Sequence, residues 1–279
     1  MHNKKAAIQF AWIFAVIIGA LVLFLAFYFI GTNVERSGET EQTVLTQGFD
    51  TILNPFSYVG AMGAAMARII ELPKPQDINF TCEKDSSFGS MTMVLSKETK
   101  GLPKTINDKY IFSRNLENTK QVLAISMPLK LPWRVADIIV FVPMKNKYCI
   151  KNSGSDLKKL LTDLTENIDS GRFVFDNCDP ENVKITLDRT LPDELQLASA
   201  FSDPDIYECN VIRLKKRLGK QVDIYNGKIR SLIAAGCNMN IDLNLLEIEA
   251  GKANKDVETL VNLADSIARL NKIGSCSLF

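Results

Sequence analysis

The first and longest pattern along the chain is an uncharged apolar run. Residues 6–34 contain no Asp, Glu, Lys or Arg. A helix of about 20 apolar residues is long enough to cross the hydrocarbon core of a bilayer. Residues 1–34 are therefore predicted to be a short tail and a transmembrane helix.

The charges that flank this helix predict its orientation. Lys4 and Lys5 lie directly before it, whereas Glu35 and Arg36 after it carry opposite charges. The positive-inside rule then keeps the N-terminus in the cytoplasm. Residues 35–279 are expected outside the cytoplasm, which makes the chain a single-pass protein of the cell membrane.

Two kinds of processing are alternatives to an intact anchor. A cleaved secretory signal has an apolar core of about 7–15 residues, and residues 27–29 lack the small residues of a cleavage site. A pilin-type signal is cut near the basic pair, here beside Ala6 and Ala7, and leaves the apolar helix on the mature chain. Small residues at four-residue spacing form a face suited to self-association, although such residues are common in membrane helices: Ala11, Ala15 and Gly19.

Residues 35–75 are expected to form a membrane-proximal helical stalk. Apolar residues recur at helical spacing over 44–53. The segment 58–72 is rich in Gly, Ala and Met but too short to span a bilayer, so a helix or close-packed loop is expected there. Pro73 and Pro75 mark the entry to the main domain.

The hydrophobic period then changes from helical to two, which predicts a mainly β region over 76–199. Segments rich in alternating, β-branched or aromatic residues are 91–95, 110–112, 123–127, 135–142, 173–175 and 183–187. One amphipathic helix interrupts them, with Ser155 as its expected N-cap. Its apolar stripe is Leu157, Leu160, Leu161, Leu164 and Ile168.

Residues 200–279 are predicted to be helical. Asp203 and Pro204 are typical of an N-cap and a first helical position. Apolar residues then step by three or four up to Leu232, which indicates about seven turns ending near Gly236. A last helix is expected over 255–272, and these helices are expected to pack antiparallel. The fold class is thus α+β: an N-terminal transmembrane helix, a mainly β region with one helix, and a C-terminal helical region.

Charge and cysteine content narrow the context of this domain. The formal net charge is +1, and acids and bases are mixed along the chain, unlike the basic stripe of a nucleic-acid-binding protein. All six cysteines follow the predicted anchor and none forms a Cys-x-x-Cys pair: Cys82, Cys149, Cys178, Cys209, Cys237 and Cys276. An even number on the exported side predicts disulfides. Cys237 and Cys276, which bracket the last helices, are expected to join each other.

A glycosylation acceptor is also present. Asn79, Phe80 and Thr81 match the N-glycosylation pattern. The tripeptide also arises by chance, and here it lies in a predicted strand, so Asn79 is a glycosylation candidate only in an exported chain.

The lone histidine, His2, is the most informative residue for chemistry. Its position excludes Ser-His-Asp and Cys-His catalysis from the exported domain. The chain also lacks phosphate-binding glycine loops and calcium-binding loops. No catalytic residue, cofactor or metal site is therefore expected.

Two groups of charged residues have both a structural and a functional interpretation. The acids are Asp176, Asp179, Glu181 and Asp188, and Asp203, Asp205 and Glu208; the basic run is Arg213, Lys215, Lys216, Arg217 and Lys220. Acids in turns and at helix starts are usually structural, but a glycosidase needs two of them across a cleft. The basic run is expected to form a solvated helix face, and contact with an anionic surface is the alternative.

Several short segments together resemble a known family. They are Lys-Lys-Ala-Ala-Ile-Gln-Phe-Ala-Trp at 4–12, Asn-Pro-Phe at 54–56, and the segments 107–113, 134–137, 147–149, 201–209 and 275–279. In this combination the chain resembles single-pass membrane proteins of small-genome archaea, a family without an assigned activity. The resemblance implies topology and an archaeal surface context, and no site residues. The anchor also resembles archaeal pilin-like signal segments, but it has Ala6 and Ala7 at the cut point and a larger domain than a pilin.

The leading functional prediction is therefore a cell-surface protein with a binding or structural role. Its expected partners are the membrane and a protein, which includes self-association, and not nucleic acid. The alternatives are a pilin-like subunit assembled through its N-terminal helix and a carboxylate-based hydrolase of surface glycans.

Overall fold

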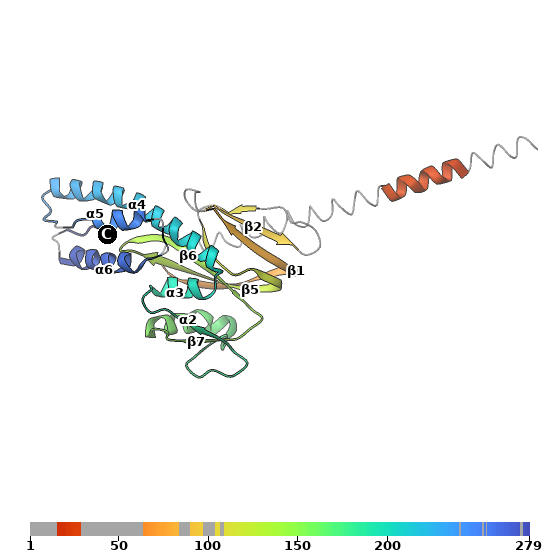
Figure 1. The fold of residues 1–279 in the computed structure, drawn as a ribbon, viewed down its shortest axis with the longest axis horizontal. Coiled ribbons are helices and arrows are strands. Elements are labelled where there is room, and N and C mark those ends of the chain that lie inside the picture. Colours follow the sequence, from red (N-terminus) through yellow and green to blue (C-terminus); the bar gives the residue numbers. More distant parts are fainter. Residues whose placement is uncertain are drawn as a thin grey trace, which may run out of the picture. The chain divides into compact units, whose positions relative to one another are not determined.

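The computed structural model describes residues 16–28, 64–83, 90–96, 104–106, 109–239, 241–252, 254, 256–273 and 276–279. The chain divides into two compact units, Met1–Gln47 and Gly48–Phe279. In the first unit, residues 16–28 are helical and exposed (Figure 1). Among the helices described, none combines the length and apolarity needed to cross a bilayer. Residues 6–15 and 29–34 of the predicted anchor lie outside the described residues.

The second unit is an α+β domain in which the β region packs against the C-terminal helices. Its strands are β1 (Met66–Cys82), β2 (Met91–Ser96), β3 (Lys104–Ile106), β4 (Tyr110–Phe112), β5 (Leu116–Lys130), β6 (Arg134–Pro143), β7 (Tyr148–Lys151), β8 (Phe173–Phe175) and β9 (Val183–Thr186). Its helices are α2 (Ser155–Asp169), α3 (Asp193–Ala200), α4 (Pro204–Ala234), α5 (Asn244–Gly251) and α6 (Glu258–Ile273). The predicted strands and the helices α2, α4 and α6 are confirmed, whereas α3 and α5 were not predicted.

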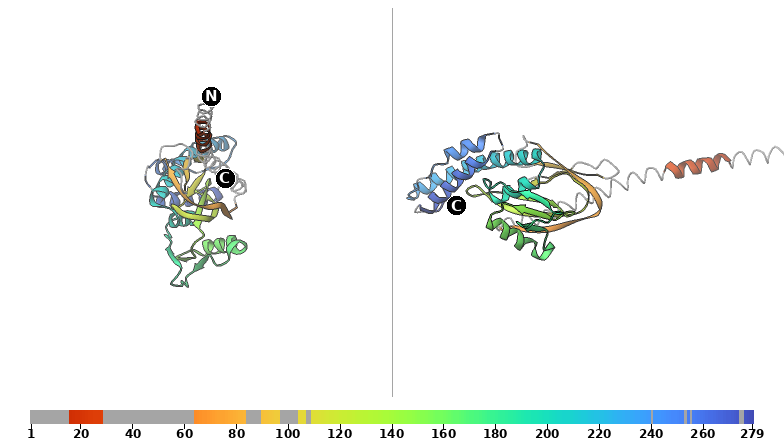
Figure 2. Two further views of the ribbon diagram at one scale, coloured as in Figure 1. Left: turned by 90° about the vertical axis from the view of Figure 1, so that its right-hand side faces the viewer. Right: turned by 60° about the horizontal axis from the view of Figure 1, so that its bottom comes forward.

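The larger sheet has six strands in the order β3-β2-β1-β5-β6-β4, and parts of β5 and β6 are buried on both faces. All residues of β5 from Val122 to Met127 are buried, so successive side chains enter cores on opposite faces. Figure 2 shows the sheet strongly curved. The curvature brings β2 close to β4, although the two strands are far apart in the strand order. The backbone N–H of Ile111 in β4 donates to Met91 Sδ in β2 at 3.3 Å. The buried rings of Phe80 and Phe141 pack against each other, with their centroids 5.6 Å apart.

The predicted helical stalk over 35–75 is wrong for residues 66–75, which belong to β1. Residues 66–71 pair with β5, and the pairing shifts register between Glu71 and Gln76. Pro73 and Pro75 lie in this interval, where β1 forms no pairs with β5 and the missing N–H groups of proline interrupt no hydrogen bond between these two strands. The prolines therefore mark a break in the ladder within one strand and not the entry to the domain. The rest of the predicted stalk, 35–63, lies outside the described residues.

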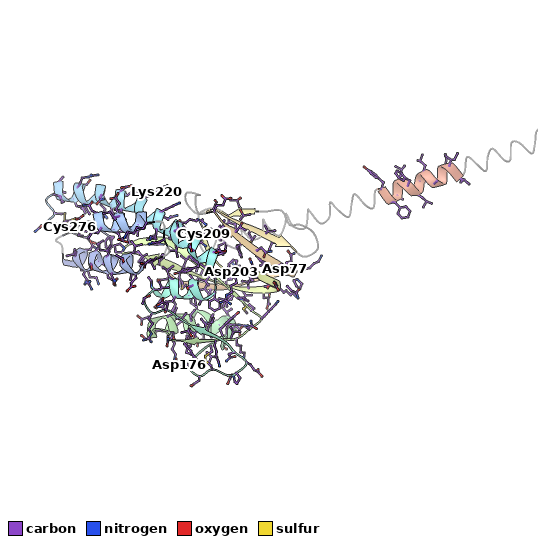
Figure 3. The ribbon with its side chains drawn as sticks, viewed as in Figure 1. Asp77, Asp176, Asp203, Cys209, Lys220 and Cys276 are labelled. Carbon is purple, nitrogen blue, oxygen red and sulfur yellow. A yellow bond between two sulfur atoms is a disulfide. The ribbon has the colours of Figure 1, made fainter. Side chains whose placement is uncertain are left out.

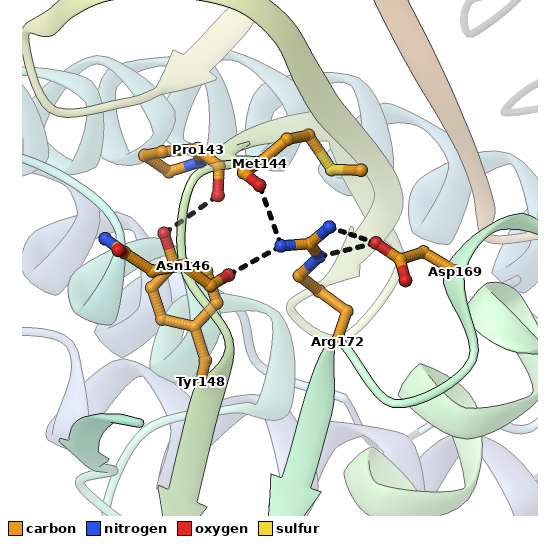
Figure 4. A network of polar contacts seen from close by, with 6 residues as sticks. All are labelled: Pro143, Met144, Asn146, Tyr148, Asp169 and Arg172. Atoms are coloured by element: carbon orange, nitrogen blue, oxygen red, sulfur yellow. Dashed lines mark hydrogen bonds and ion pairs between the residues drawn. The ribbon is translucent and has the colours of Figure 1, made fainter. Parts of the chain in front are cut away.

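A second sheet, in the order β8-β7-β9, is parallel and carries α2 in the connection from β7 to β8. The N-cap of α2 is Gly154, which corrects the prediction of Ser155, now the first helical residue. Arg172 secures the far end of this connection (Figure 4). Its guanidinium donates to Asp169 and, through Nη1, to the carbonyls of Met144 at 2.8 Å and Asn146 at 2.7 Å. This network holds the end of α2 against the turn between β6 and β7.

The C-terminal helices do not follow the predicted antiparallel packing throughout. Lys215 contacts the segment before α6, and Cys237 after α4 is bridged to Cys276 after α6. These two helices therefore run in the same direction. The short helix α5 returns between them, with Ala250 beside Gly219. The prediction of antiparallel packing was wrong for α4 and α6 because it did not include α5, which reverses the chain direction between them.

The six cysteines form three disulfides: Cys82–Cys209, Cys149–Cys178 and Cys237–Cys276. The last is the pair expected from the helices that it brackets. Cys82–Cys209 joins the end of β1 to α4, and Cys149–Cys178 joins β7 to the loop after β8. Three bridges of this kind are typical of extracellular proteins.

The basic run on α4 is not a uniformly solvated face, because Arg213 and Lys215 are 2% and 3% exposed. Arg213 Nη1 lies 3.0 Å from Cys82 Sγ, and its guanidinium lies over the ring of Tyr110 at 5.3 Å. Lys215 Nζ donates to Oδ1 of Asn254 at 2.6 Å and to the carbonyl of Asp256 at 3.1 Å. Burial lowers the pKa of both side chains. These two cations thus stabilise packing, and only the neighbouring positions face solvent.

The role of Lys215 is testable by substitution. Lys215→Met keeps the length of the side chain but leaves the acceptors of Asn254 and Asp256 without their donor. We expect the free energy of unfolding to fall by about 1.5–3 kcal/mol, the usual contribution of hydrogen bonds that involve a charged group. Lys159 on α2, which is exposed, provides the control, and Lys159→Met is expected to change the free energy of unfolding by less than about 0.5 kcal/mol. Urea denaturation measures both variants, and equal values would contradict the assigned role.

Candidate functional site

The candidate site is a cleft of about 440 Å³ formed by three segments of the second unit. One segment is the loop between β9 and α3, another runs from the end of α3 into α4, and the third precedes and begins α6. The lining residues are Asp188, Thr190, Leu191, Ser199, Ser202, Pro204, Tyr207, Asp256, Val257 and Glu258. Its volume is typical of a site for a small ligand.

The turn between α3 and α4 is fixed to the residues that follow β4. The backbone N–H of Asp203 donates to the carbonyl of Ser113 at 3.1 Å, and Asp203 Oδ2 accepts from the N–H of Asn115 at 2.9 Å. Arg114 donates to the carbonyl of Ala200 at 2.8 Å. Asp203 occupies the predicted N-cap position before Pro204, but its side chain makes no hydrogen bond to the helix. Its carboxylate positions this wall of the cleft instead.

The wall before α6 is equally ordered by hydrogen bonds. Asp256 Oδ1 accepts from the backbone N–H of Glu258 at 3.0 Å. The carbonyl of Asp256 accepts from Lys215, as described above. Both walls are thus held by bonds within the domain, which favours a preformed cleft.

The charges in the cleft are negative. Asp188, Asp256 and Glu258 contribute carboxylates, and the described residues that line the cleft include no Lys, Arg or His. Asp188 Oδ1 accepts from the backbone N–H of Thr190 at 3.0 Å and from its hydroxyl at 2.8 Å. These hydrogen bonds hold the pKa of Asp188 below its ordinary value. Asp188 is therefore ionised at neutral pH.

Tyr207 also lines the cleft, and its hydroxyl is protonated. Burial, with a smaller contribution from the charge of Asp188, raises the pKa of Tyr207 to about 12. Its ring packs against Phe112 with centroids 5.9 Å apart. The hydroxyl oxygen is shielded from solvent and has no hydrogen-bond partner in the described part of the chain. Buried hydroxyls usually have a partner, so this one stands out.

The described residues that line the cleft include neither a histidine nor a cysteine. The only histidine is His2, and every cysteine is in a disulfide. Within the described residues, no group of three or more His, Cys, Asp or Glu side chains is arranged to hold a metal ion. What the cleft offers is fixed negative charge, hydroxyl groups and a tyrosine ring.

Of the acids selected from the sequence, only Asp188 lines the cleft. Figure 3 places Asp176 apart from Asp203 and Cys209, and Asp176 forms an ion pair with Lys158 at 3.8 Å. The remaining candidates, Asp179, Glu181, Asp205 and Glu208, are not among the lining residues. The sequence therefore did not identify a carboxylate cluster that the fold assembles.

Asp256 and Glu258 were missed because acids at a helix start are ordinarily structural. The available signal was their position at the start of the last predicted helix, but nothing local indicated that this helix would lie beside Asp188. The glycosylation candidate, Asn79, lies in β1 opposite Val94 and is half-buried between two buried neighbours. Its glycosylation stays a prediction.

Comparison of the chain with family models, curated proteins and solved structures finds no match. The resemblance to archaeal membrane proteins therefore stays a prediction.

The unpartnered hydroxyl predicts an unusual response to Tyr207→Phe. At pH 7 the free energy of unfolding is expected to change by less than about 1 kcal/mol, because no hydrogen bond is lost. Because the folded-state pKa is raised to about 12, wild-type protein loses stability as pH rises from the ordinary tyrosine pKa of about 10. The variant lacks this contribution and should lose less stability over that range.

Tyr148→Phe is the matched comparison. The Tyr148 hydroxyl donates to the carbonyl of Pro143 at 2.9 Å (Figure 4), so its removal is expected to cost about 1 kcal/mol at pH 7. Denaturation at pH 7 and at pH 11 measures both variants. A loss above about 2 kcal/mol for Tyr207→Phe at pH 7 would show that its hydroxyl has a partner.

Proposed function

We propose that the chain is a membrane-anchored protein whose disulfide-bridged domain binds a ligand or partner outside the cytoplasm. The uncharged run over residues 6–34 supports the anchor, and the three disulfides support an oxidising compartment. Binding, and not chemistry, is the proposed role of the domain.

The observation that carries the binding role is the acidic cleft. Its walls come from segments more than 60 residues apart in sequence, around Asp188 and Asp256, and hydrogen bonds fix each wall. The described residues that line it include no histidine and no cysteine. A preformed polar cleft of this size is well suited to bind without reorganising, which reduces the entropy lost on binding.

A surface glycan hydrolase is the second candidate, because carboxylates from separate segments line one cleft. Glycoside hydrolysis needs one carboxylic acid that is protonated and one carboxylate. Asp188 fits the ionised role, since its pKa is lowered. Asp256 or Glu258 would have to supply the proton. Release of reducing sugar from isolated cell-surface glycans, abolished by both Asp188→Asn and Glu258→Gln, would replace the binding proposal with this one.

The proposed topology predicts the pattern of surface labelling. Intact cells are treated with a membrane-impermeant amine-reactive reagent, and labelled lysines are identified by peptide mass spectrometry. We expect label on lysines after residue 35 and none on Lys4 or Lys5. A variant without residues 6–34 is expected to leave the membrane fraction.

A known cytoplasmic protein is the control for cell integrity. Labelling of the domain only after lysis would contradict the proposal and place the disulfides in the cytoplasm, as occurs in some hyperthermophiles. The same spectra report the mature N-terminus. A mature N-terminus at Ala6 or Ala7 would favour the pilin-like alternative, and an N-terminus at Met1 or His2 would count against it.

A further inference from the structure

We propose that the Cys82–Cys209 disulfide is a site of reversible thiol–disulfide exchange with a dithiol reductant, and that Arg213 stabilises the Cys82 thiolate which the exchange produces. This is a modification of the domain by a partner and leaves the proposed binding role as it is. Three features of the structure support it: the buried charge of Arg213, its contact with Cys82 and the unequal exposure of the two cysteines.

Arg213 is a buried cation without a counter-ion among the described residues. Arginine keeps its positive charge in proteins. Its Nη1 contacts Cys82 Sγ at 3.0 Å and Asn210 Oδ1 at 3.2 Å. Its Nε and Nη2 are buried and have no hydrogen-bond partner in the part of the chain that the structure describes. A buried charge without a partner is costly, so a negative charge placed beside Arg213 would be strongly stabilised.

The contact with Cys82 shows where such a negative charge can form. Cys82 Sγ is neutral in the disulfide and becomes negative when the bridge is reduced to a thiolate. A neighbouring cation lowers the pKa of a thiol, and a disulfide whose reduced form is stabilised is more readily reduced. Reduction of the Cys82–Cys209 bridge would therefore give Arg213 the counter-ion that it lacks in the oxidised domain.

The other charged and titratable groups near the bridge act less directly. The guanidinium of Arg217, one turn further along α4, lies over the ring of Tyr110 at 6.0 Å. Glu83 and Glu208 adjoin the two cysteines in sequence, and their charges would oppose a thiolate. Glu83 is exposed and Glu208 half-buried, so solvent screens both more than it screens the buried contact of Arg213.

The exposure of the two cysteines sets the order of the exchange. Cys82 is half-buried, whereas Cys209 is 2% exposed, so the thiolate of the reductant attacks Cys82 Sγ. The bond between the two protein sulfurs breaks, and Cys209 leaves with the electron pair and takes up a proton. Cys82 is then held in a mixed disulfide with the reductant.

The second step releases Cys82 beside Arg213. The second thiol of the reductant loses its proton to solvent and attacks the reductant's own sulfur in the mixed disulfide. Cys82 leaves with the electron pair as a thiolate, and the reductant becomes a disulfide. The protein bridge has gained the two electrons that the dithiol has lost.

The exchange alters a covalent attachment between distant parts of the chain. Cys82 is the last residue of β1, and Cys209, which is labelled in Figure 3, lies on α4, 127 residues later in the sequence. In the reduced domain, Asn210 Nδ2 can still donate to the carbonyl of Ile111, the bond of 2.8 Å that joins α4 to β4. We therefore expect the reduced domain to stay folded, with α4 held less tightly.

The test is a redox titration of the full chain in detergent micelles with reduced and oxidised dithiothreitol, read by differential alkylation and peptide mass spectrometry. Arg213→Gln removes the charge and is expected to lower the equilibrium constant for reduction of Cys82–Cys209 about tenfold, which for two electrons is about 30 mV. Arg213→Lys keeps the charge and should recover part of the loss. The Cys149–Cys178 bridge in the same samples is the internal reference and should not change.

Arg217→Gln is the matched control. It removes a cation that packs on the same tyrosine ring as Arg213, and it should leave the equilibrium constant for Cys82–Cys209 unchanged. Circular dichroism establishes that the oxidised and reduced variants are folded. A second measurement needs no variant: the rate of alkylation of Cys82 in reduced wild-type protein is followed against pH. The apparent pKa of this thiol is expected to lie at least about one unit below the ordinary value of about 8.5.

Each outcome supports or overturns the proposal. A lower equilibrium constant in Arg213→Gln alone, together with a low pKa of the Cys82 thiol, supports it. Equal constants in wild-type protein and Arg213→Gln would overturn it, and so would an equal loss in Arg217→Gln, which would indicate a general change in packing. If Arg213→Gln does not fold, the alkylation profile decides, and a Cys82 pKa at or above the ordinary value overturns the proposal.

Discussion

The attachment of α4 to the curved sheet is the constraint on which the rest of the domain depends. This 31-residue helix crosses the end of the sheet where β4 is an edge strand. Asn210 Nδ2 donates to the carbonyl of Ile111 at 2.8 Å and so satisfies the edge that the sheet leaves open. The Cys82–Cys209 bridge, one residue away, ties the same turn of α4 to β1. Helix and sheet are therefore joined covalently and by a buried hydrogen bond at one place.

Two buried cations on α4 add further contacts, one to the sheet and one to the segment before α6. Arg213 is enclosed without an ion pair to any described carboxylate, and its charge is met by Asn210 Oδ1 at 3.2 Å, a disulfide sulfur and the ring of Tyr110. Lys215, on the other side, holds the segment before α6. Burial of two cations costs free energy that neutral packing would avoid. What they add is specificity, because Arg213 Nη1 and Lys215 Nζ reach their acceptors in one arrangement of the elements, although Arg213 Nε and Nη2 are buried without a hydrogen-bond partner among the described residues.

The cleft follows from that arrangement. The start of α4 supplies Tyr207, the residues before it are tied to the loop after β4, and Lys215 places Asp256 at the same edge. No single segment contains a recognisable site. The proposed role is therefore a property of how three chain segments meet, and its chemistry is fixed charge and open hydrogen-bonding groups.

The sequence by itself determined the local properties of the chain. The uncharged run, the strand and helix periods, the cysteines available for disulfides and the lack of a histidine in the domain can all be read without a structure. Tertiary structure alone decided that residues 66–72 form a strand, because the partner β5 outweighs the helical propensity of Ala and Met. The burial of Arg213 and Lys215 also depends on tertiary structure, since Arg and Lys are usually exposed. The same holds for the position of Asp188, Asp256 and Glu258 in one cleft. The physical reason is that periodicity encodes which face of an element is apolar, whereas the partner of that face comes from a distant part of the chain.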